Sequence, residues 1–152
     1  MADELTREEQ RQLGVDLFNH VWTLLENPNR TPEQNDEMLN ATYASAYHWS
    51  KAGTTANIAR SQWQISRVYC ELGRPEPALY HAGRCVAYCE SDPDAMEDWD
   101  LPFAFEALAR AHLTAGDTAE AKRVADQTRE LAAQIEDEKD REILERDLAT
   151  LP

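Results

Sequence analysis

The sequence contains no long hydrophobic run and only three cysteines, and both shortages exclude classes of protein. A membrane-spanning helix needs about 20 consecutive apolar residues, and no stretch comes near that length. The polar start Met1–Thr6 has none of the character of a signal peptide. An odd number of cysteines without a regular spacing indicates reduced thiols in a cytosol rather than a disulfide framework. We therefore expect a cytoplasmic protein that does not enter a membrane.

Basic residues are also scarce, because 15 Lys and Arg stand against 29 Asp and Glu, for a formal net charge of −14. Binding to nucleic acid depends on neutralising phosphates with positive charge, and anionic membrane surfaces require the same, so neither is an expected partner. Most of the acidic residues are expected to solvate the outer faces of helices. At 152 residues with 42% hydrophobic content, the chain is predicted to fold as one domain, residues 1–152.

Catalytic motifs are missing as well. The sequence has no glycine-rich phosphate loop, no HExxH pair and no serine in a nucleophile elbow. It therefore predicts a protein that is not an enzyme and that uses no cofactor.

Two segments contain residues that bind metals in other proteins. His81, Cys85 and Cys89 recur at four-residue intervals, but a helix places the first and last about 12 Å apart along its axis, too far for one zinc ion to bind all three. The acidic segment Ser91–Asp100 lacks the glycine that turns a calcium loop. Neither segment predicts a metal site, and Trp99 is expected to fold back onto the helices or to contact a partner.

The hydrophobic spacing predicts an all-α protein with six main helices and a seventh in the charged tail. Thr31, Pro32 and Gln34 form the expected start of the second helix, as an N-cap, a first-turn proline and a capping-box partner. The helices pair into three hairpins, at about 6–52, 55–90 and 101–135. Residues 137–151 are expected to cover the end of the stack.

Two of these helices end on a glycine in a similar context, and small residues follow in the next helix. One copy reads Ile65, Ser66, Tyr69, Gly73, Ala78 and Ala82, and the other reads Leu108, Ala109, His112, Gly116, Ala121 and Ala125. This order resembles the tetratricopeptide repeat (TPR), a helix–turn–helix of 34 residues. The resemblance implies a right-handed stack of three helical hairpins with a C-terminal capping helix. At each glycine we expect a positive φ that ends the helix.

The chain departs from the TPR pattern in several places, so that about half of it carries the resemblance. The two glycines are 43 residues apart rather than 34. Gln62 and Phe105 stand where the repeat usually has tryptophan, and His112 replaces the aromatic residue.

In TPR-like stacks the first helix of each hairpin lines a concave groove. Carried over by position, the groove residues are Arg60, Trp63, Arg67 and Glu71 from the third helix and Phe103, Glu106 and Arg110 from the fifth. Independently of the family, the spacing of Arg60, Trp63 and Arg67 places them on one helix face. Arginine binds carboxylates through a bidentate fork, and an indole offers a flat apolar platform.

The predicted function is therefore the non-catalytic binding of a protein or peptide segment, which can be acidic. The predicted contacts are Arg60, Trp63, Arg67, Glu106 and Arg110. In the alternative arrangement, the arginines pair with acidic residues of neighbouring helices while Trp63 fills the core.

Two other functions remain open from the sequence. Tyr43, Tyr47, Trp49 and Trp22 accompany His20 and His48 on the first two helices, either as core, as an aromatic wall of the groove, or around a helical-bundle enzyme, a small-molecule site or a metal site. His20 and His48 could meet across that hairpin, although a lone histidine pair is more often hydrogen-bonded structure than a site. The third possibility is a homo-oligomer that forms through exposed hairpin faces.

Overall fold

A computed structural model describes residues 4–152, so that Met1–Asp3 of the expected polar start lie outside the described part. The regular secondary structure of the described residues is all helical, with seven α-helices and one short 3₁₀ helix. They are α1 (Arg7–Leu25), α2 (Pro32–Ala52), α3 (Thr55–Glu71), α4 (Pro75–Ser91), η1 (Pro93–Ala95), α5 (Asp100–Thr114), α6 (Thr118–Ala132) and α7 (Glu138–Leu148). The expectation of an all-α chain is confirmed.

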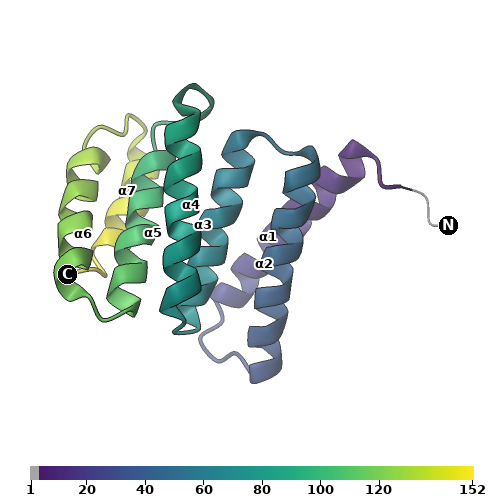
Figure 1. Ribbon diagram of the computed structural model, residues 1–152, viewed down its shortest axis with the longest axis horizontal. Coiled ribbons are helices and arrows are strands. Elements are labelled where there is room, and N and C mark those ends of the chain that lie inside the picture. The colour runs from purple at the N-terminus through teal and green to yellow at the C-terminus, as the bar shows by residue number, and fades with distance from the viewer. Residues whose placement is uncertain (1–3) are drawn as a thin grey trace.

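The α-helices pack in adjacent pairs, α1 with α2, α3 with α4, and α5 with α6, and α7 lies against the last pair (Figure 1). The odd-numbered helices contact one another in turn, from α1 to α3 to α5 to α7. The even-numbered helices make few or no contacts with one another. The odd helices are thus the more closely connected of the two layers, and we call them the inner layer.

Threonine side chains start the first three helices. Thr6, Thr31 and Thr54 each accept a hydrogen bond from the backbone N–H three residues on, and the side chain at that position bonds back. The capping box predicted at Thr31 with Gln34 is therefore confirmed, with Pro32 in the first helical position. Such caps satisfy N–H groups that a helix start would otherwise leave unbonded.

Gly73 and Gly116 end α3 and α5 with φ angles of 68° and 81°, as expected from the sequence. After each glycine, a backbone N–H bonds back to the last turn: Arg74 N to Tyr69 O at 2.9 Å, and Asp117 N to His112 O at 3.0 Å. These are Schellman turns, which need the left-handed backbone that glycine adopts without strain. The same turn therefore closes both hairpins.

The interior of the stack is filled largely by small residues. Ala78 and Ala82 of α4 and Ala121 and Ala125 of α6 are fully buried. Ser66 is also buried, and its hydroxyl donates to the Ala78 carbonyl oxygen at 2.9 Å. Small side chains allow paired helices to approach closely, so little space remains between the two layers.

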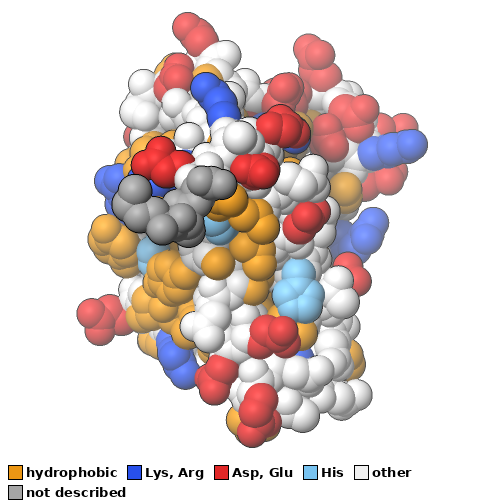
Figure 2. Space-filling model, turned by 90° about the vertical axis from the view of Figure 1, so that its right-hand side faces the viewer, with side chains coloured by type: hydrophobic (Ala, Val, Ile, Leu, Met, Phe, Trp, Pro, Cys, Tyr) orange, Lys and Arg blue, Asp and Glu red, His pale blue; other side chains and the backbone are white. Residues whose placement is uncertain are grey.

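The two ends of the stack differ. At the C-terminal end, Leu144 and Leu148 of α7 and the following Leu151 pack into the cluster that contains Val124 and Ile135. At the other end, α1 and α2 present apolar side chains among acidic ones (Figure 2), and Tyr47 is 58% exposed there. Within residues 4–152, every helix is too short or too polar to cross a lipid bilayer.

A polar cluster joins the first two hairpins. The Tyr43 hydroxyl of α2 lies 2.8 Å from that of Tyr69 in α3 and 3.0 Å from His81 Nε2 in α4. His81 Nδ1 lies 2.7 Å from the side-chain amide oxygen of Gln62, Oε1, which can only accept a hydrogen bond. His81 therefore donates from Nδ1–H to Gln62, and its Nε2 accepts from the Tyr43 hydroxyl. Burial lowers the pKa of His81, which keeps the ring neutral in the folded protein.

This lowered pKa predicts that the protein loses stability on acidification. In the unfolded chain His81 binds a proton near pH 6.5, whereas in the fold it resists doing so, so the contribution is full above that pH and is lost as the pH falls below it. We expect the free energy of unfolding of the His81→Gln variant to vary less between pH 7.5 and pH 5 than that of the parent. Urea unfolding across this range measures it.

His20→Gln is the matched control, because that side chain is 44% exposed. It should keep the pH dependence of the parent. A His81→Gln profile parallel to that of the parent contradicts the prediction.

Candidate binding site

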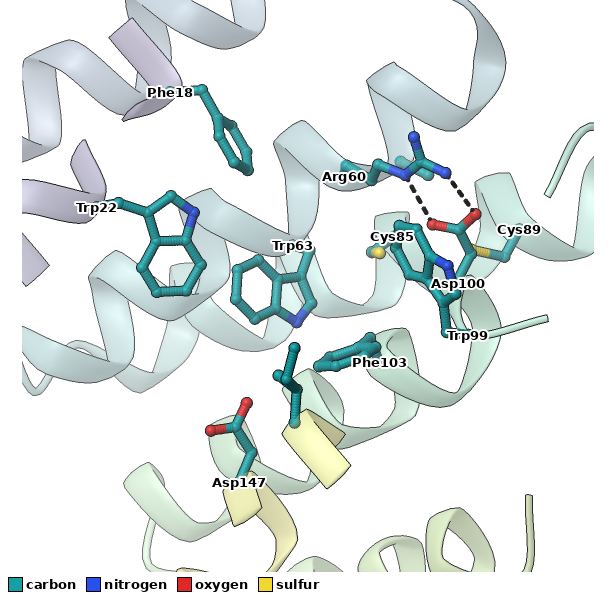
Figure 3. A pocket seen from close by; sticks show the side chains of 12 residues that line it. Phe18, Trp22, Arg60, Trp63, Cys85, Cys89, Trp99, Asp100, Phe103 and Asp147 are labelled. Atoms are coloured by element: carbon teal, nitrogen blue, oxygen red, sulfur yellow. Dashed lines mark hydrogen bonds and ion pairs between the residues drawn. The ribbon is translucent and has the colours of Figure 1, made fainter. Parts of the chain in front are cut away.

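The inner layer of helices encloses a cavity of about 290 Å³ that opens to solvent. Its wall is mainly aromatic, and Figure 3 shows the rings reaching it from separate helices. The aromatic wall consists of Phe18 and Trp22 from α1, Trp63 from α3, Trp99 from the segment before α5, and Phe103 from α5. Ile143 and Asp147 of α7 complete one side, so all four odd helices contribute to a single site.

The rings contact one another as a chain across the cavity. The ring centroids of Trp22 and Trp63 are 5.6 Å apart, and those of Trp63 and Phe103 are 6.3 Å apart in an edge-to-face arrangement. Trp99 meets Phe103 edge-to-face at 6.1 Å. Such contacts hold each ring in place, so the cavity wall is built before any ligand arrives.

One end of the cavity holds a buried ion pair. Arg60 donates from Nε and Nη2 to the two carboxylate oxygens of Asp100, both at 2.9 Å (Figure 3). The guanidinium carbon lies 4.5 Å from the centroid of the Trp99 ring. Asp100 is only 4% exposed, and it also accepts from the backbone N–H of Glu97. The hydrogen bond to Asp100 raises the pKa of Arg60.

A second buried carboxylate lies two turns further along α5. Glu106 Oε1 accepts from Arg110 Nε at 2.8 Å and lies 3.8 Å from Arg67 Nη1 of α3. Arg110 Nη2 also donates to the Asp147 carbonyl oxygen and to the Thr150 hydroxyl. Although both arginines favour the charged carboxylate, burial is the larger effect and raises the pKa of Glu106.

Three buried polar atoms in this region have no hydrogen-bond partner among the described residues. They are Trp63 Nε1, Arg67 Nη1 and Glu106 Oε2. Trp63 and Arg67 are one turn apart on α3, and Arg67 faces Glu106. Unpaired buried donors and acceptors are uncommon in folded proteins, so their occurrence beside the cavity distinguishes this region from the rest of the core.

The five predicted contact residues lie together at the α3–α5 seam, but their charges are already paired within the chain. Arg60 is bound to Asp100, and Arg67 and Arg110 share Glu106. This is the alternative arrangement that the sequence left open for the arginines. Trp63 lines the cavity instead of being fully enclosed in the core.

Phe18, Asp100 and Asp147 line the cavity but are not among the residues predicted from the sequence. Asp100 follows Trp99, so the pair of an indole and a carboxylate at the start of α5 was a usable signal. Phe18 and Trp22 are four residues apart and share a helix face, which also indicates a common surface. For Asp147 no sequence signal exists, because its place depends on how α7 returns to the inner layer.

His20 and His48, which the sequence left free to meet across the first hairpin, have separate partners. His20 Nε2 lies 3.4 Å from Glu37 near the start of α2, whereas His48 Nδ1 lies 2.6 Å from Gln10 near the start of α1. Glu37 and His48 both belong to α2 and are about 16 Å apart along its axis. The contact of His20 and the contact of His48 therefore lie at different levels of the hairpin. The two histidines therefore do not form a common centre.

The aromatic residues near these histidines also separate. Tyr43 belongs to the polar cluster with Tyr69 and His81, Tyr47 is largely exposed, and Trp22 lines the cavity. Within residues 4–152, no group of three or more His, Cys, Asp or Glu side chains is arranged to hold a metal ion.

Cys85 and Cys89 of α4 line the cavity beside Asp100. A hydrogen bond between the two thiols raises the pKa of Cys85 and lowers that of Cys89. His81 does not join them, because its ring nitrogens bond to Gln62 and Tyr43.

Comparison of the chain with protein-family models, with curated proteins and with solved structures finds no match.

The ion pair between Arg60 and Asp100 predicts that substitution of Asp100 destabilises the protein. Asp100→Asn leaves Arg60, which is only 32% exposed, without its counter-charge. We expect the free energy of unfolding to fall by about 1–3 kcal/mol, below the range for a fully buried pair. Chemical denaturation measures the change. The control is Asp126→Asn, in an exposed pair with Lys122 and Arg129, and a loss of stability there as large as at Asp100 contradicts the prediction.

Proposed function

We propose that the chain is a non-catalytic, TPR-like binding module whose concave inner layer holds a segment of another protein. In this arrangement three hairpins form a right-handed stack, α7 caps it, and the odd helices line the groove. The observation that carries the proposal is the open aromatic cavity to which all four odd helices contribute. Apolar cavities with a few convergent polar groups are the common form of binding site in proteins.

The size of the cavity supports a peptide segment over a larger compound. At about 290 Å³, it lies at the lower end of the range for small-molecule pockets. A cavity of this size suits an anchoring side chain of a partner, while the remaining contacts are made along the groove. Tryptophan and arginine, which are both present here, are the residues that most often carry binding energy in interfaces.

The ion pairs support binding without catalysis. Asp100 and Glu106 are each buried and engaged by arginines, which favours a structural role for both carboxylates. Their role in the proposal is to hold α3 and α5 together beneath the bound segment. The three cysteines are all free thiols, which is consistent with the reducing cytoplasm that we propose as the compartment.

A charge placed at the cavity mouth should abolish this binding. Ile143 lines the cavity and is 48% exposed, so Ile143→Lys adds a charge to the binding surface without emptying the core. Peptides selected from a random display library on the parent protein provide the ligand. We expect Ile143→Lys to weaken the binding of a selected peptide at least about 30-fold in a fluorescence-polarisation titration, the effect of losing one hot-spot contact.

Tyr80→Lys is the matched control, because Tyr80 is 63% exposed on α4 and does not line the cavity. It should bind like the parent, and both variants should keep the unfolding midpoint of the parent. Equal affinities for the parent and Ile143→Lys would place the peptide elsewhere. A library that yields no binder, with light scattering that shows concentration-dependent self-association, would favour a homo-oligomer instead.

A further inference from the structure

Both ends of the cavity have an indole and a carboxylate. Among the described residues, a cationic side chain, that of Arg60, pairs with the carboxylate at the Trp99 end alone. At the Trp99 end, the Arg60 guanidinium lies over the indole and is bound by the Asp100 carboxylate. This end is therefore a complete set of indole, cation and carboxylate, supplied by the chain itself. Cations are attracted to indole faces by the ring quadrupole, and a nearby carboxylate balances their charge.

The opposite end has the indoles and the carboxylate. Trp22 and Trp63 lie 5.6 Å apart with an angle of 33° between their planes. Figure 3 shows the Asp147 carboxylate pointing toward these two rings from α7. Among residues 4–152, no Lys, Arg or His pairs with that carboxylate. Arg110 contacts the backbone carbonyl of Asp147 instead, and its side chain is otherwise bound to Glu106 and Thr150.

We propose that an alkylammonium group of the bound segment, carried by a lysine side chain, completes this end of the cavity between Trp22, Trp63 and Asp147. The inference rests on the proposed function, because it names the anchor that the segment inserts. It also revises the charge of the partner, from an acidic segment to a basic one.

The apolar wall defines which ammonium groups fit best. A bare ammonium is strongly hydrated and loses its water on entering, whereas N-methyl groups spread the charge and contact the rings directly. Trimethyllysine therefore binds more tightly than unmodified lysine. The carbon chain of the lysine lies along Ile143, which is half-exposed at the mouth.

Charges elsewhere in the protein act in the same direction. Arg67 and Arg110 both pair with Glu106, which takes up part of their positive charge and so reduces their repulsion of an incoming cation. The net charge of −14 over the whole chain attracts basic segments from a distance and raises their association rate.

The test uses two small probes that differ only in charge: trimethyllysine with both ends blocked, and its isostere with a tert-butyl group in place of trimethylammonium. Binding is followed through the indole N–H signals of the four tryptophans in nuclear magnetic resonance titrations. Trp49 packs against Gly14 and does not line this cavity, so its signal is the internal reference. We expect the signals of Trp22 and Trp63 to shift, with a dissociation constant about tenfold lower for the charged probe.

Two variants locate the effect. Asp147→Asn keeps the backbone carbonyl that Arg110 binds and should remove the preference for the charged probe. Glu142→Gln makes the same change of charge on the exposed face of α7 and should leave the preference intact. Raising the salt concentration should weaken the charged probe and leave the neutral one unchanged.

The outcomes separate this inference from the proposed function. Equal affinities for the two probes, or no shift with either, overturn the ammonium site, while peptide capture at the cavity still stands or falls by the Ile143→Lys experiment. A charged-probe preference that depends on Asp147, with no peptide captured, retains the ammonium site and rejects the protein segment as its source.

Discussion

The contact between α3 and α5 is the interaction on which the site depends, and two buried carboxylates hold it. Asp100 and Glu106 lie nearly out of contact with solvent on α5, and each is met by an arginine of α3. Burying a carboxylate without a counter-charge costs free energy. The helices therefore pack so that Arg60 reaches Asp100 and Arg67 reaches Glu106. The two helices are thereby fixed side by side, with Trp63 and Phe103 between the two ion pairs.

These ion pairs change what the arginines of α3 can bind. On one helix face, Arg60 and Arg67 beside Trp63 suggest a basic groove for carboxylates. In the fold their charges are taken up by α5, and what remains for a partner is the aromatic surface between them. Asp147, without an ion pair of its own among the described residues, then becomes the charge that faces the cavity. The groove of this acidic protein is therefore apolar with an acidic edge.

Local chemistry explains which features could be predicted from the sequence. The cap at Thr31 and the helix ends at Gly73 and Gly116 depend on neighbouring residues, and all three were predicted. The clustering of Arg60, Trp63 and Arg67 follows from helical spacing. The cavity could not be predicted, because it joins Trp22 of α1 to Asp147 of α7, and their proximity depends on how the helix pairs stack. The separation of His20 from His48 could not be predicted either, since hairpin register is not encoded in helical period.

The sequence resembles a TPR, and its longer spacing between the two helix-ending glycines provides the Arg60 end of the cavity. A spacing of 43 residues between Gly73 and Gly116, against 34 in a TPR, leaves room for the segment between α4 and α5. That segment contains η1 and ends in Trp99 and Asp100, which hold Arg60 at the cavity end. A repeat of regular length would join α4 to α5 by a short turn, and Arg60 would lose both partners. The segment therefore forms the Arg60 end of the cavity, and in the proposed function that end helps to define where a partner anchors.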